Sequence, residues 1–545
     1  MRIFPIRSFA AAGVLAAFGL NAACGPPDLG PVPENTSHLW GSEGERWDPA
    51  GRLPDFSYAG YRAGNEPIPR VPVRANVRDF GAVGDGVTDD SLAFLDAIAQ
   101  TERGAILIPA GRYLITRPLF IKKSHIVLRG ESRDSTVLFF PKTLTEALGH
   151  GKDGRPSSWS WGGGWIWANP ELERGDSNAP VWDEGKRLAE VTRRAPRGQT
   201  WIRVSDTAGL EPGQMVRLIQ HESDGSLTMA MHAGHPLGGK CIIDVPGFQI
   251  INWLLEIKRV EGNKVHFDRP LRLDVKPEWK AELHEAVIEV EEVGIERMTI
   301  EFALTPYAGH HNEPGHNAIS LGQTYNSWVR DVAILNADNG IFFWYARYAT
   351  AENIVIAGRG GHYGFNLGGA QDSLVTRFRI ENRNLHDTSF SNMANGNVYS
   401  WGKGRNINFD HHRGASFQNL SSRIDVGIPN RQWVSSGTRS GHYTAAHETY
   451  WNIRPRAETR RLDTWPAQNI IGRVKESKRS TSDWFDLYFE HVDELEPTDL
   501  HLAQWHRRTG LEMPKRPRWP KRLPEGRVVN TGVGPGRFPE DLVQR

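Results

Sequence analysis

The sequence predicts an all-β protein whose main body is a β-solenoid, a chain that winds round and stacks one short strand on another at each turn. Strand-like runs such as "WVRDVAIL", "AENIVIAG" and "VTRFRIEN" recur from about residue 287, each followed by a Gly- or Asn-rich turn. Ile334, Ile356 and Ile380 in these runs lie 22 and 24 residues apart, a period that is typical of solenoids. The 56 glycines suit a fold with many tight turns.

Length and charge limit the function classes. A chain of 545 residues is too long for one ordinary compact domain, so it fits several domains or one elongated repeat with decorations. Apolar residues make up 39% and charged residues 24%, which is a globular composition. A formal net charge of +1 gives no reason to expect nucleic acid or an anionic membrane as partner.

Residues 1–24 resemble a bacterial export signal, with Arg2 and Arg7 ahead of an apolar run that is too short to remain as a membrane span. Cys24 follows two alanines, as in a lipoprotein cleavage box, although Asn21 stands where leucine is usual. A lipid anchor on Cys24 and simple cleavage both stay open. We therefore expect an exported protein: periplasmic, attached to the outer membrane, or secreted. Cys241 is the only other cysteine, so no internal disulfide is expected once Cys24 is lipidated or removed.

Residues 73–140 predict the first coils and a helix that caps them. "VRANVRDFGAVGDGVTDDSLAFLDAIAQ" reads as a short strand, a glycine-rich turn and a helix capped by Thr88 or Asp89. Leu92, Leu95 and Ile98 would form the apolar face of this helix. "GAILIPAGRYLI" and "IVLRGESRDSTVLFF" then predict further strands.

These motifs, over about residues 74–140, resemble the opening of the pectate-lyase-like superfamily of right-handed parallel β-helices. The superfamily includes polygalacturonases, polysaccharide lyases and phage tailspikes. The resemblance implies a single-stranded, right-handed parallel β-helix with a short N-terminal helix cap, and a protein that degrades polysaccharides. It also implies that Asp85, Asp89 and Asp90 are turn and cap residues rather than catalysts.

The remaining chain divides by its patterns. Residues 25–72 are an irregular lead-in, and residues 141–286 combine a Trp-rich loop with an inserted β-rich subdomain. Residues 287–470 are the main β-helix with the expected groove, and residues 471–545 a C-terminal cap and tail. In that cap, "EPTDLHLAQWHRRTG" predicts a helix with Thr498 as N-cap and Gly510 just past its end.

The Trp-rich loop "SSWSWGGGWIWANP" offers aromatic faces on which sugar rings stack. Trp165 is our candidate for substrate binding there, and core packing is the alternative reading.

"NINFDHHRG" is the candidate centre of the groove. Because alternate residues of a strand share a face, Asn406, Asn408, Asp410 and His412 should point outward, with Ile407, Phe409 and His411 on the inner side. Stacked coils would set these outward side chains beside polar residues that are distant in sequence. Histidines gather in this part of the chain, where His310, His311, His316, His362 and Glu313 also lie.

Three functions compete for this groove. β-Elimination on an anionic, uronic-acid polymer needs a base, a group that neutralises the carboxylate, and an acid. His412 is the candidate base, Arg413 or Arg439 the neutralising group and Tyr443 the acid, with Asp410 beside them. The candidates for substrate binding are His386, Arg423, Asp425, His442 and His447.

Glycoside hydrolysis would instead need two carboxyl groups, drawn from Asp338, Asp387, Asp410 and Asp425. The motifs of polygalacturonases are only partly present, since no Asp-Asp pair or "RIK" follows "NAD". A lyase is therefore the preferred prediction, a hydrolase the alternative, and a non-catalytic carbohydrate-binding solenoid the third reading.

No metal follows from the sequence alone. Ca²⁺ is one ion to consider, with oxygen ligands from Asn406, Asn408 and Asp410. Zn²⁺ with His386, His411 and His412 is another.

Overall fold

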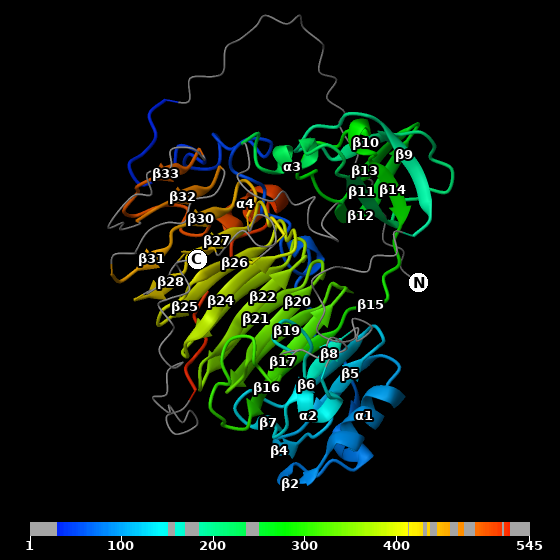
Figure 1. Ribbon diagram of the computed structural model, residues 1–545, viewed down its shortest axis with the longest axis vertical. Coiled ribbons are helices and arrows are strands. Elements are labelled where there is room, and N and C mark those ends of the chain that lie inside the picture. Colours follow the sequence, from blue (N-terminus) through cyan, green and yellow to red (C-terminus); the bar gives the residue numbers. More distant parts are fainter. Residues whose placement is uncertain are drawn as a thin grey trace, which may run out of the picture.

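The computed structural model describes residues 30–150, 159–168, 185–235, 250–412, 414–428, 433–435, 444–457, 467–473, 486–514 and 517–523. These residues form a right-handed parallel β-helix with a separate β-barrel beside one end of the stack (Figure 1). The fold class predicted from the sequence is confirmed.

The coils are built from two parallel sheets. The eight-stranded sheet consists of β5 (Leu119–Ile121), β8 (Ile166–Ala168), β17 (Asn317–Gly322), β20 (Asn339–Trp344), β22 (Gly361–Gly368), β24 (Asn384–Ser391), β26 (Phe409–His412) and β29 (Trp433–Ser435). The first strands of the seventeen-stranded sheet are β1 (Val73–Asn76), β2 (Asp85–Asp89), β3 (Gly104–Ile108), β4 (Gly111–Leu114), β6 (Ile126–Gly130) and β7 (Thr136–Phe140). It continues through β16 (Gly294–Phe302), β19 (Trp328–Leu335), β21 (Thr350–Ala357), β23 (Leu374–Ile380), β25 (Val398–Gly404), β27 (Leu420–Ser422), β28 (Asp425–Gly427), β30 (Thr449–Trp451), β31 (Arg454–Pro455), β32 (Asn469–Ile471) and β33 (Tyr488–Glu490). A small parallel pair, β15 (Val290–Glu291) and β18 (Thr324–Tyr325), lies at a turn.

The predicted sequence period matches the pairing of strands on successive coils. Ile334 pairs with Ile356, and Ile356 pairs with Ile380, on neighbouring strands. All three side chains are buried in one apolar core between the sheets. The 22- and 24-residue spacings therefore measure one turn of the solenoid each.

The long strands bend at one fixed position in each coil. A non-glycine residue with φ between 50° and 61° sits at this position, namely Arg297, Asp331, Asn353, Arg377 and Trp401. Such left-handed backbone is uncommon outside glycine, and here it turns the strand so that its second half continues around the core. The Asn353 amide donates to the Asp331 carboxylate on the coil before, at 2.7 Å. The corner is thus tied from coil to coil.

Helix α1 (Ser91–Gln100) covers the N-terminal end of the stack, at the bottom of Figure 1. Its N-cap is Asp90, not Thr88 or Asp89, and Asp90 accepts hydrogen bonds from the backbone of Val83 and Gly84. Of the predicted apolar face, Ile98 is buried and Leu95 packs partly buried against the core, whereas Leu92 is exposed. Phe94 and Ala97 complete the buried face.

The inserted strands close into an antiparallel barrel in the order β10-β13-β12-β11-β14-β9. Their bounds are β9 (Arg187–Arg193), β10 (Trp201–Val204), β11 (Met215–His221), β12 (Ile250–Glu261), β13 (Lys264–Phe267) and β14 (Glu282–Glu285). The barrel has its own apolar core and lies at the top right of Figure 1. The short helices α2 (Leu144–Leu148) and α3 (Ser226–Met231), and the 3₁₀ turns η1 (Tyr61–Gly64), η2 (Val77–Phe80) and η4 (Pro277–Trp279), join these parts.

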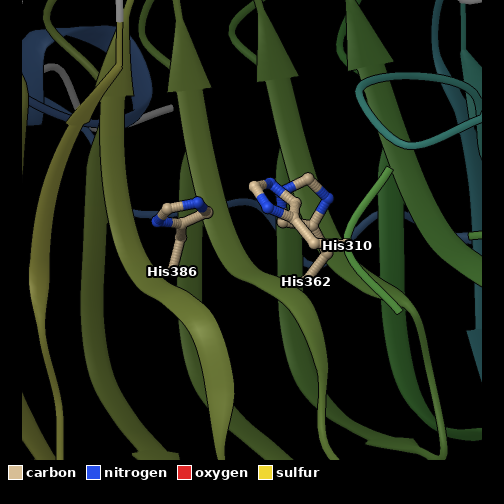
Figure 2. A group of neighbouring side chains, drawn as sticks. All are labelled: His310, His362 and His386. Atoms are coloured by element: carbon tan, nitrogen blue, oxygen red, sulfur yellow. The ribbon is translucent and has the colours of Figure 1, made fainter. Parts of the chain in front are cut away.

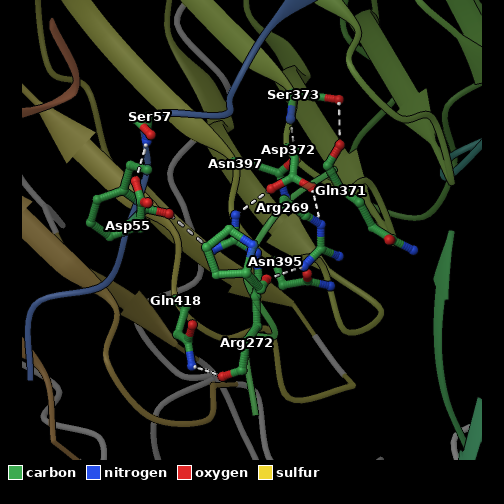
Figure 3. Close-up of polar contacts among 12 residues, drawn as sticks. Asp55, Ser57, Arg269, Arg272, Gln371, Asp372, Ser373, Asn395, Asn397 and Gln418 are labelled. Atoms are coloured by element: carbon green, nitrogen blue, oxygen red, sulfur yellow. Dashed lines mark hydrogen bonds and ion pairs between the residues drawn. The ribbon is translucent and has the colours of Figure 1, made fainter. Parts of the chain in front are cut away.

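A buried ion cluster fixes the barrel segment to the β-helix (Figure 3). Asp372, in the turn before β23, faces Arg269 at 2.7 Å and also contacts Arg272. Arg347 lies 3.8 Å from the same carboxylate and pairs with Asp268 at 2.6 Å. Burial alone would raise the pKa of Asp372, but the three guanidinium groups keep it below its usual value. A charged carboxylate is therefore the centre of this junction.

The lead-in and the C-terminal cap close on each other. Helix α4 (Leu500–Thr509) has Asp499 as its N-cap, whose carboxylate accepts from the His501 backbone, so the predicted cap Thr498 was wrong by one residue. Gly510 ends the helix in left-handed backbone, as predicted. Phe56 and Leu53 of the lead-in pack with Leu500 in one apolar cluster. Among the described residues, no helix is long and apolar enough to cross a membrane.

Candidate active site

The outer face of the eight-stranded sheet carries the candidate site. In β26, Phe409 points into the core, and Asp410 and His412 lie on the other side. His411 returns to the inside, where its ring lies 5.8 Å from Phe390 and its Nε2 3.5 Å from the Glu448 carboxylate. The structure thus separates the two adjacent histidines as the alternation predicts, and a Zn²⁺ set that includes both His411 and His412 is excluded.

Histidines from neighbouring coils meet on this face. His386 of β24 lies with its ring centre 5.2 Å from that of His412 and 5.3 Å from that of His362 of β22. His310, in the segment 303–316 that precedes β17, lies 4.8 Å from His362 and 6.0 Å from His386. Figure 2 shows His310, His362 and His386 beside one another above the strands. We call His310, His362, His386 and His412 the histidine row.

Asp410 supports one end of the row. Its carboxylate lies 3.1 Å from Nδ1 of His386 and 3.6 Å from Nδ1 of His412, and it accepts a 2.7 Å hydrogen bond from the Ser389 hydroxyl. The side chain is fully buried. Burial alone would raise the pKa of Asp410, but the two facing imidazoles hold it well below its usual value. Asp410 is therefore an ionised group that orients two histidines.

Glu313 supports the other end. Its carboxyl group lies 3.2 Å from Nδ1 of His362, and it accepts hydrogen bonds from the hydroxyls of Tyr307, at 2.6 Å, and Ser160. Burial raises the pKa of Glu313, and its hydrogen bonds from Ser160 and Tyr307 offset this effect only in part. Asp410 and Glu313 thus lie behind the histidines rather than on the open face.

Burial also keeps part of the row uncharged. Although His310 is exposed as a residue, desolvation of its ring against the neighbouring strands lowers its pKa to about 3, with the neighbouring histidines adding to the effect. The pKa of His362 is lowered well below its usual value for the same two reasons. Neutral imidazoles have a free lone pair, so they act as bases or as metal ligands rather than as cations.

Of the tryptophans in the Trp-rich loop, Trp161 and not Trp165 lies beside the row. Trp165 is fully buried against Phe140 and donates from its indole to the Gly315 carbonyl, so our assignment of Trp165 to substrate binding was wrong. Trp161 is half-buried and lies 5.0 Å from His311 and 6.4 Å from His362. The glycines between the two tryptophans lie outside any strand, so the inward and outward alternation of strand side chains does not apply across them.

The carboxylates considered for hydrolysis do not gather on this face. Asp338 is buried in an ion pair with Arg359 at 2.6 Å. Asp387 bonds to the Asn384 amide and the Asn408 backbone in the interior, where burial raises its pKa to about 7. Asp425 pairs with Arg423 on the seventeen-stranded sheet. Of the four candidates, Asp410 alone lies at the histidine row.

The other predicted residues fall in three groups. Arg423 packs its guanidinium over Trp401 and Trp519, away from the row, so the structure does not support Arg423 and Asp425 as substrate-binding residues of this site. His447 is buried before β30, where burial and the nearby Arg197 and Arg52 lower its pKa well below its usual value, and it does not join the row either. Arg413, Arg439, His442 and Tyr443 lie outside the described residues.

The oxygen ligands considered for Ca²⁺ are not brought together. Both polar atoms of the Asn408 amide bond to the backbone and carboxylate of Asp387 or to the Leu385 carbonyl, whereas Asp410 faces histidines. Two groups of described residues have ligand atoms within 4.8 Å of one another: His310 with His362 and His386, and His386 with Asp410 and His412. Sequence reasoning named these residues but missed Tyr307 and Ser160, whose contacts with Glu313 follow no strand periodicity. It also missed Ser389, which pairs with Asp410 on the neighbouring strand.

Stacked parallel coils with a polar site on an outer sheet face define the chain as a parallel β-helix protein. The family model for rhamnogalacturonase A/epimerase, pectate lyase-like, matches residues 74–155. The resemblance to pectate-lyase-like proteins is thereby confirmed for the opening coils.

Three individual proteins illustrate the likeness. A glucan 1,3-beta-glucosidase from Cochliobolus carbonum is 37% identical over 131 residues, which are 22% of this chain and 16% of that protein. The tailspike protein gp49 of Pseudomonas phage LKA1 superposes with a TM-score of 0.45 at 14% identity, over 75% of this chain and 72% of the tailspike. The family 28 exopolygalacturonase of Yersinia enterocolitica gives a TM-score of 0.33 at 12% identity, over 79% and 80% of the two chains.

Proposed function

We propose that this protein is an exported enzyme that degrades a polysaccharide, which it binds on the outer face of the eight-stranded sheet. The proposed reaction is β-elimination at a uronic-acid residue of that polysaccharide. The observation that carries the proposal is the placement of Asp410 behind His386 and His412, with the imidazoles toward the open face. The match to a family of polysaccharide-degrading enzymes supports the substrate class.

Asp410 prepares His412 to accept a proton. A carboxylate beside Nδ1 favours the tautomer with hydrogen on that nitrogen, so that Nε2 keeps its lone pair. In the proposed step, Nε2 takes the proton from C5 of the uronic acid, the C4–O bond breaks, and a C4–C5 double bond forms. The departing oxygen takes a proton from an acid, for which Tyr443 remains the prediction, and Arg413 or Arg439 remains the prediction for the group that neutralises the sugar carboxylate.

The burial of the two carboxyl groups supports β-elimination over hydrolysis. A hydrolase needs carboxyl groups that reach the glycosidic oxygen and a water or the anomeric carbon. Asp410 and Glu313 are both fully buried, whereas the side chain of His412 keeps 16% of its surface exposed. The groups nearest to a bound sugar are therefore imidazoles, which suits proton abstraction better than attack by a carboxylate.

Hydrolysis is the second candidate, and two observations favour it. The glucosidase from Cochliobolus carbonum and the family description both name glycosidases. In addition, burial raises the pKa of Glu313 while the histidines hold that of Asp410 low, and an acid and a carboxylate with separated pKa values are what a hydrolase requires. Movement of His310 and His362 would be needed before a sugar could reach Glu313.

One incubation separates the two mechanisms. The purified protein is incubated with a panel of uronic-acid polysaccharides while ultraviolet absorbance and reducing ends are both measured. We expect absorbance from the new double bond, a loss of at least about a hundredfold in His412→Ala, and a similar loss in Asp410→Asn. The control is His491→Ala, at a side chain that is 52% exposed and far from the row in the fold. New reducing ends without absorbance would refute β-elimination in favour of hydrolysis, and neither signal would refute both.

Export is a separate part of the proposal. It predicts that the mature protein begins at or near Cys24 and is found outside the cytoplasm. Mass spectrometry of the N-terminal peptide from fractionated cells tests this, and an intact Met1 peptide would contradict it.

A further inference from the structure

We propose that His310, His362 and His386 bind one divalent transition-metal ion with zinc-like ligand preferences, which leaves a coordination position open toward the groove. Metal binding at these residues goes beyond the proposed function and does not depend on it.

The three imidazoles lie close enough to converge on one ion. Their ligand atoms are within 4.8 Å of one another. Tetrahedral Zn²⁺ with bonds of about 2.0–2.1 Å holds its nitrogen ligands about 3.4 Å apart. Closing this difference takes a small rotation about the side-chain torsions, because His386 and His362 project from neighbouring strands and His310 from the facing segment (Figure 2).

Two of the three imidazoles are oriented as metal ligands are. The Nδ1 atom of His362 lies 3.2 Å from Glu313, and that of His386 lies 3.1 Å from Asp410. A metal-bound histidine usually donates its second N–H to a carboxylate, which fixes the ring and makes the other nitrogen a better ligand. In this arrangement Nε2 is the atom through which each ring would bind the ion.

His362 gives an independent reason to expect a ligand. Its side chain is fully buried, yet its Nε2 has no hydrogen-bond partner. A buried polar atom without a partner costs free energy, about 1–3 kcal/mol, unless something binds to it. A metal ion at the meeting point of the three rings would supply that bond.

The donor set selects the kind of ion. Imidazole nitrogens suit Zn²⁺, Co²⁺, Ni²⁺ and Cu²⁺, whereas Ca²⁺ requires six to eight oxygen ligands. Three protein ligands with a fourth position open is the arrangement of catalytic rather than structural zinc sites. Asp410 and His412 form the competing group with His386, but the Asp410 carboxylate is already engaged by Ser389 and two histidines.

An ion at this place would deepen the proposed chemistry. It would lie beside His412, since His386 contacts both, and its open position could hold an oxygen of a sugar carboxylate. The positive charge would stabilise the negative charge that develops when C5 loses its proton. It would also tie the segment 303–316 to the sheet through His310.

The test is binding of Co²⁺ alone, followed by competition with Zn²⁺, because Co²⁺ reports its geometry through visible absorption. The protein is first freed of metal with a chelator and its fold is checked by circular dichroism. We expect uptake of one equivalent of Co²⁺ with tetrahedral absorption bands, displacement by Zn²⁺, and no competition from Ca²⁺. His362→Ala and His310→Ala should each weaken binding more than about tenfold, and His491→Ala should not.

His310→Ala keeps the test decisive if His362→Ala does not fold, because His310 lies on an exposed segment. The proposal is overturned if the wild type takes up no stoichiometric Co²⁺, if both variants bind as the wild type does, or if Ca²⁺ competes equally. Metal binding without cleavage of any polysaccharide would support the metal site and refute the proposed function. Cleavage that survives complete metal removal, with no Co²⁺ uptake, would support the proposed function and refute the metal site.

Discussion

Substitution of Asp372 by Asn tests how the barrel is held to the β-helix. Asp372 is fully buried and faces Arg269, Arg272 and Arg347, whose side chains are 0%, 5% and 1% exposed. The amide keeps the shape of the carboxylate but removes its charge. Three buried guanidinium groups would lose this partner, and Arg347 would keep its ion pair with Asp268.

The expected cost follows from the electrostatics of the cluster. Two unit charges 4 Å apart interact by about 4 kcal/mol at an effective dielectric constant of 20. Removal of one partner from a buried pair costs about 3–5 kcal/mol in measured cases, because the remaining charge stays without water. We therefore expect Asp372→Asn to lower the free energy of unfolding by about 4 kcal/mol.

Hydrogen exchange measured by mass spectrometry, together with urea unfolding, would check this value. Peptides from β11 to β14 should lose protection in the variant, while peptides from β3 to β7, in the first coils, should not. The matched control is Glu190→Gln, which breaks a pair with Arg187 whose side chains are 54% and 58% exposed, and which should cost less than about 1 kcal/mol. A loss below about 1 kcal/mol in Asp372→Asn, with unchanged exchange in the barrel, would refute the view that this carboxylate holds the junction.

Two further predictions concern the coils and the C-terminal cap. Gly130→Ala would place a Cβ 2.0 Å from the backbone oxygen of Arg297 at the strand corner. We therefore expect the free energy of unfolding to fall by more than about 2 kcal/mol, measured as a lower melting temperature. An unchanged melting temperature would show that the backbone at this corner can move to accept the methyl group. Burial lowers the pKa of His501 from 6.5 to about 4 in the folded protein. As the pH falls from 6.5 to 4, the histidine is therefore protonated in the unfolded chain but not in the folded one, and the free energy of unfolding decreases. At pH 5 this loss is about 2 kcal/mol relative to pH 7, and His501→Gln should remove it; equal pH slopes in the variant and the wild type would contradict the assignment.

The repeat, the register and the inward or outward direction of strand residues were predictable because each depends on local alternation and on one period. The same alternation placed His411 inside and His412 outside. Helix α1 shows the limit of this reasoning: Ile98 is buried as predicted, but Leu92 is exposed and Phe94 lies in the core instead.

The environment of the site could not be predicted from the same signals. Glu313 meets His362 because the segment before β17 folds back over the next coils, and no period in the sequence encodes that return. Trp161 and Trp165 look equivalent in the sequence, yet the glycines between them send one to the site and the other to the core. Contacts of this kind depend on tertiary packing, which local patterns do not describe.

The packing of the lead-in against α4 changes how this solenoid can come apart. In most repeat proteins each coil contacts only its neighbours, and terminal coils fray one at a time. Here the Phe56 backbone N–H donates to the Gln504 side-chain oxygen, and the Ser37 hydroxyl donates to Glu490, each across more than 440 residues of chain. The first described residues therefore hold the final coils in place, and the final coils cannot unfold until these contacts break. These contacts between the two ends can form only after nearly the whole chain has folded, so their formation should be a late and slow step. Once they have formed, the stacked coils should unfold together as one cooperative unit.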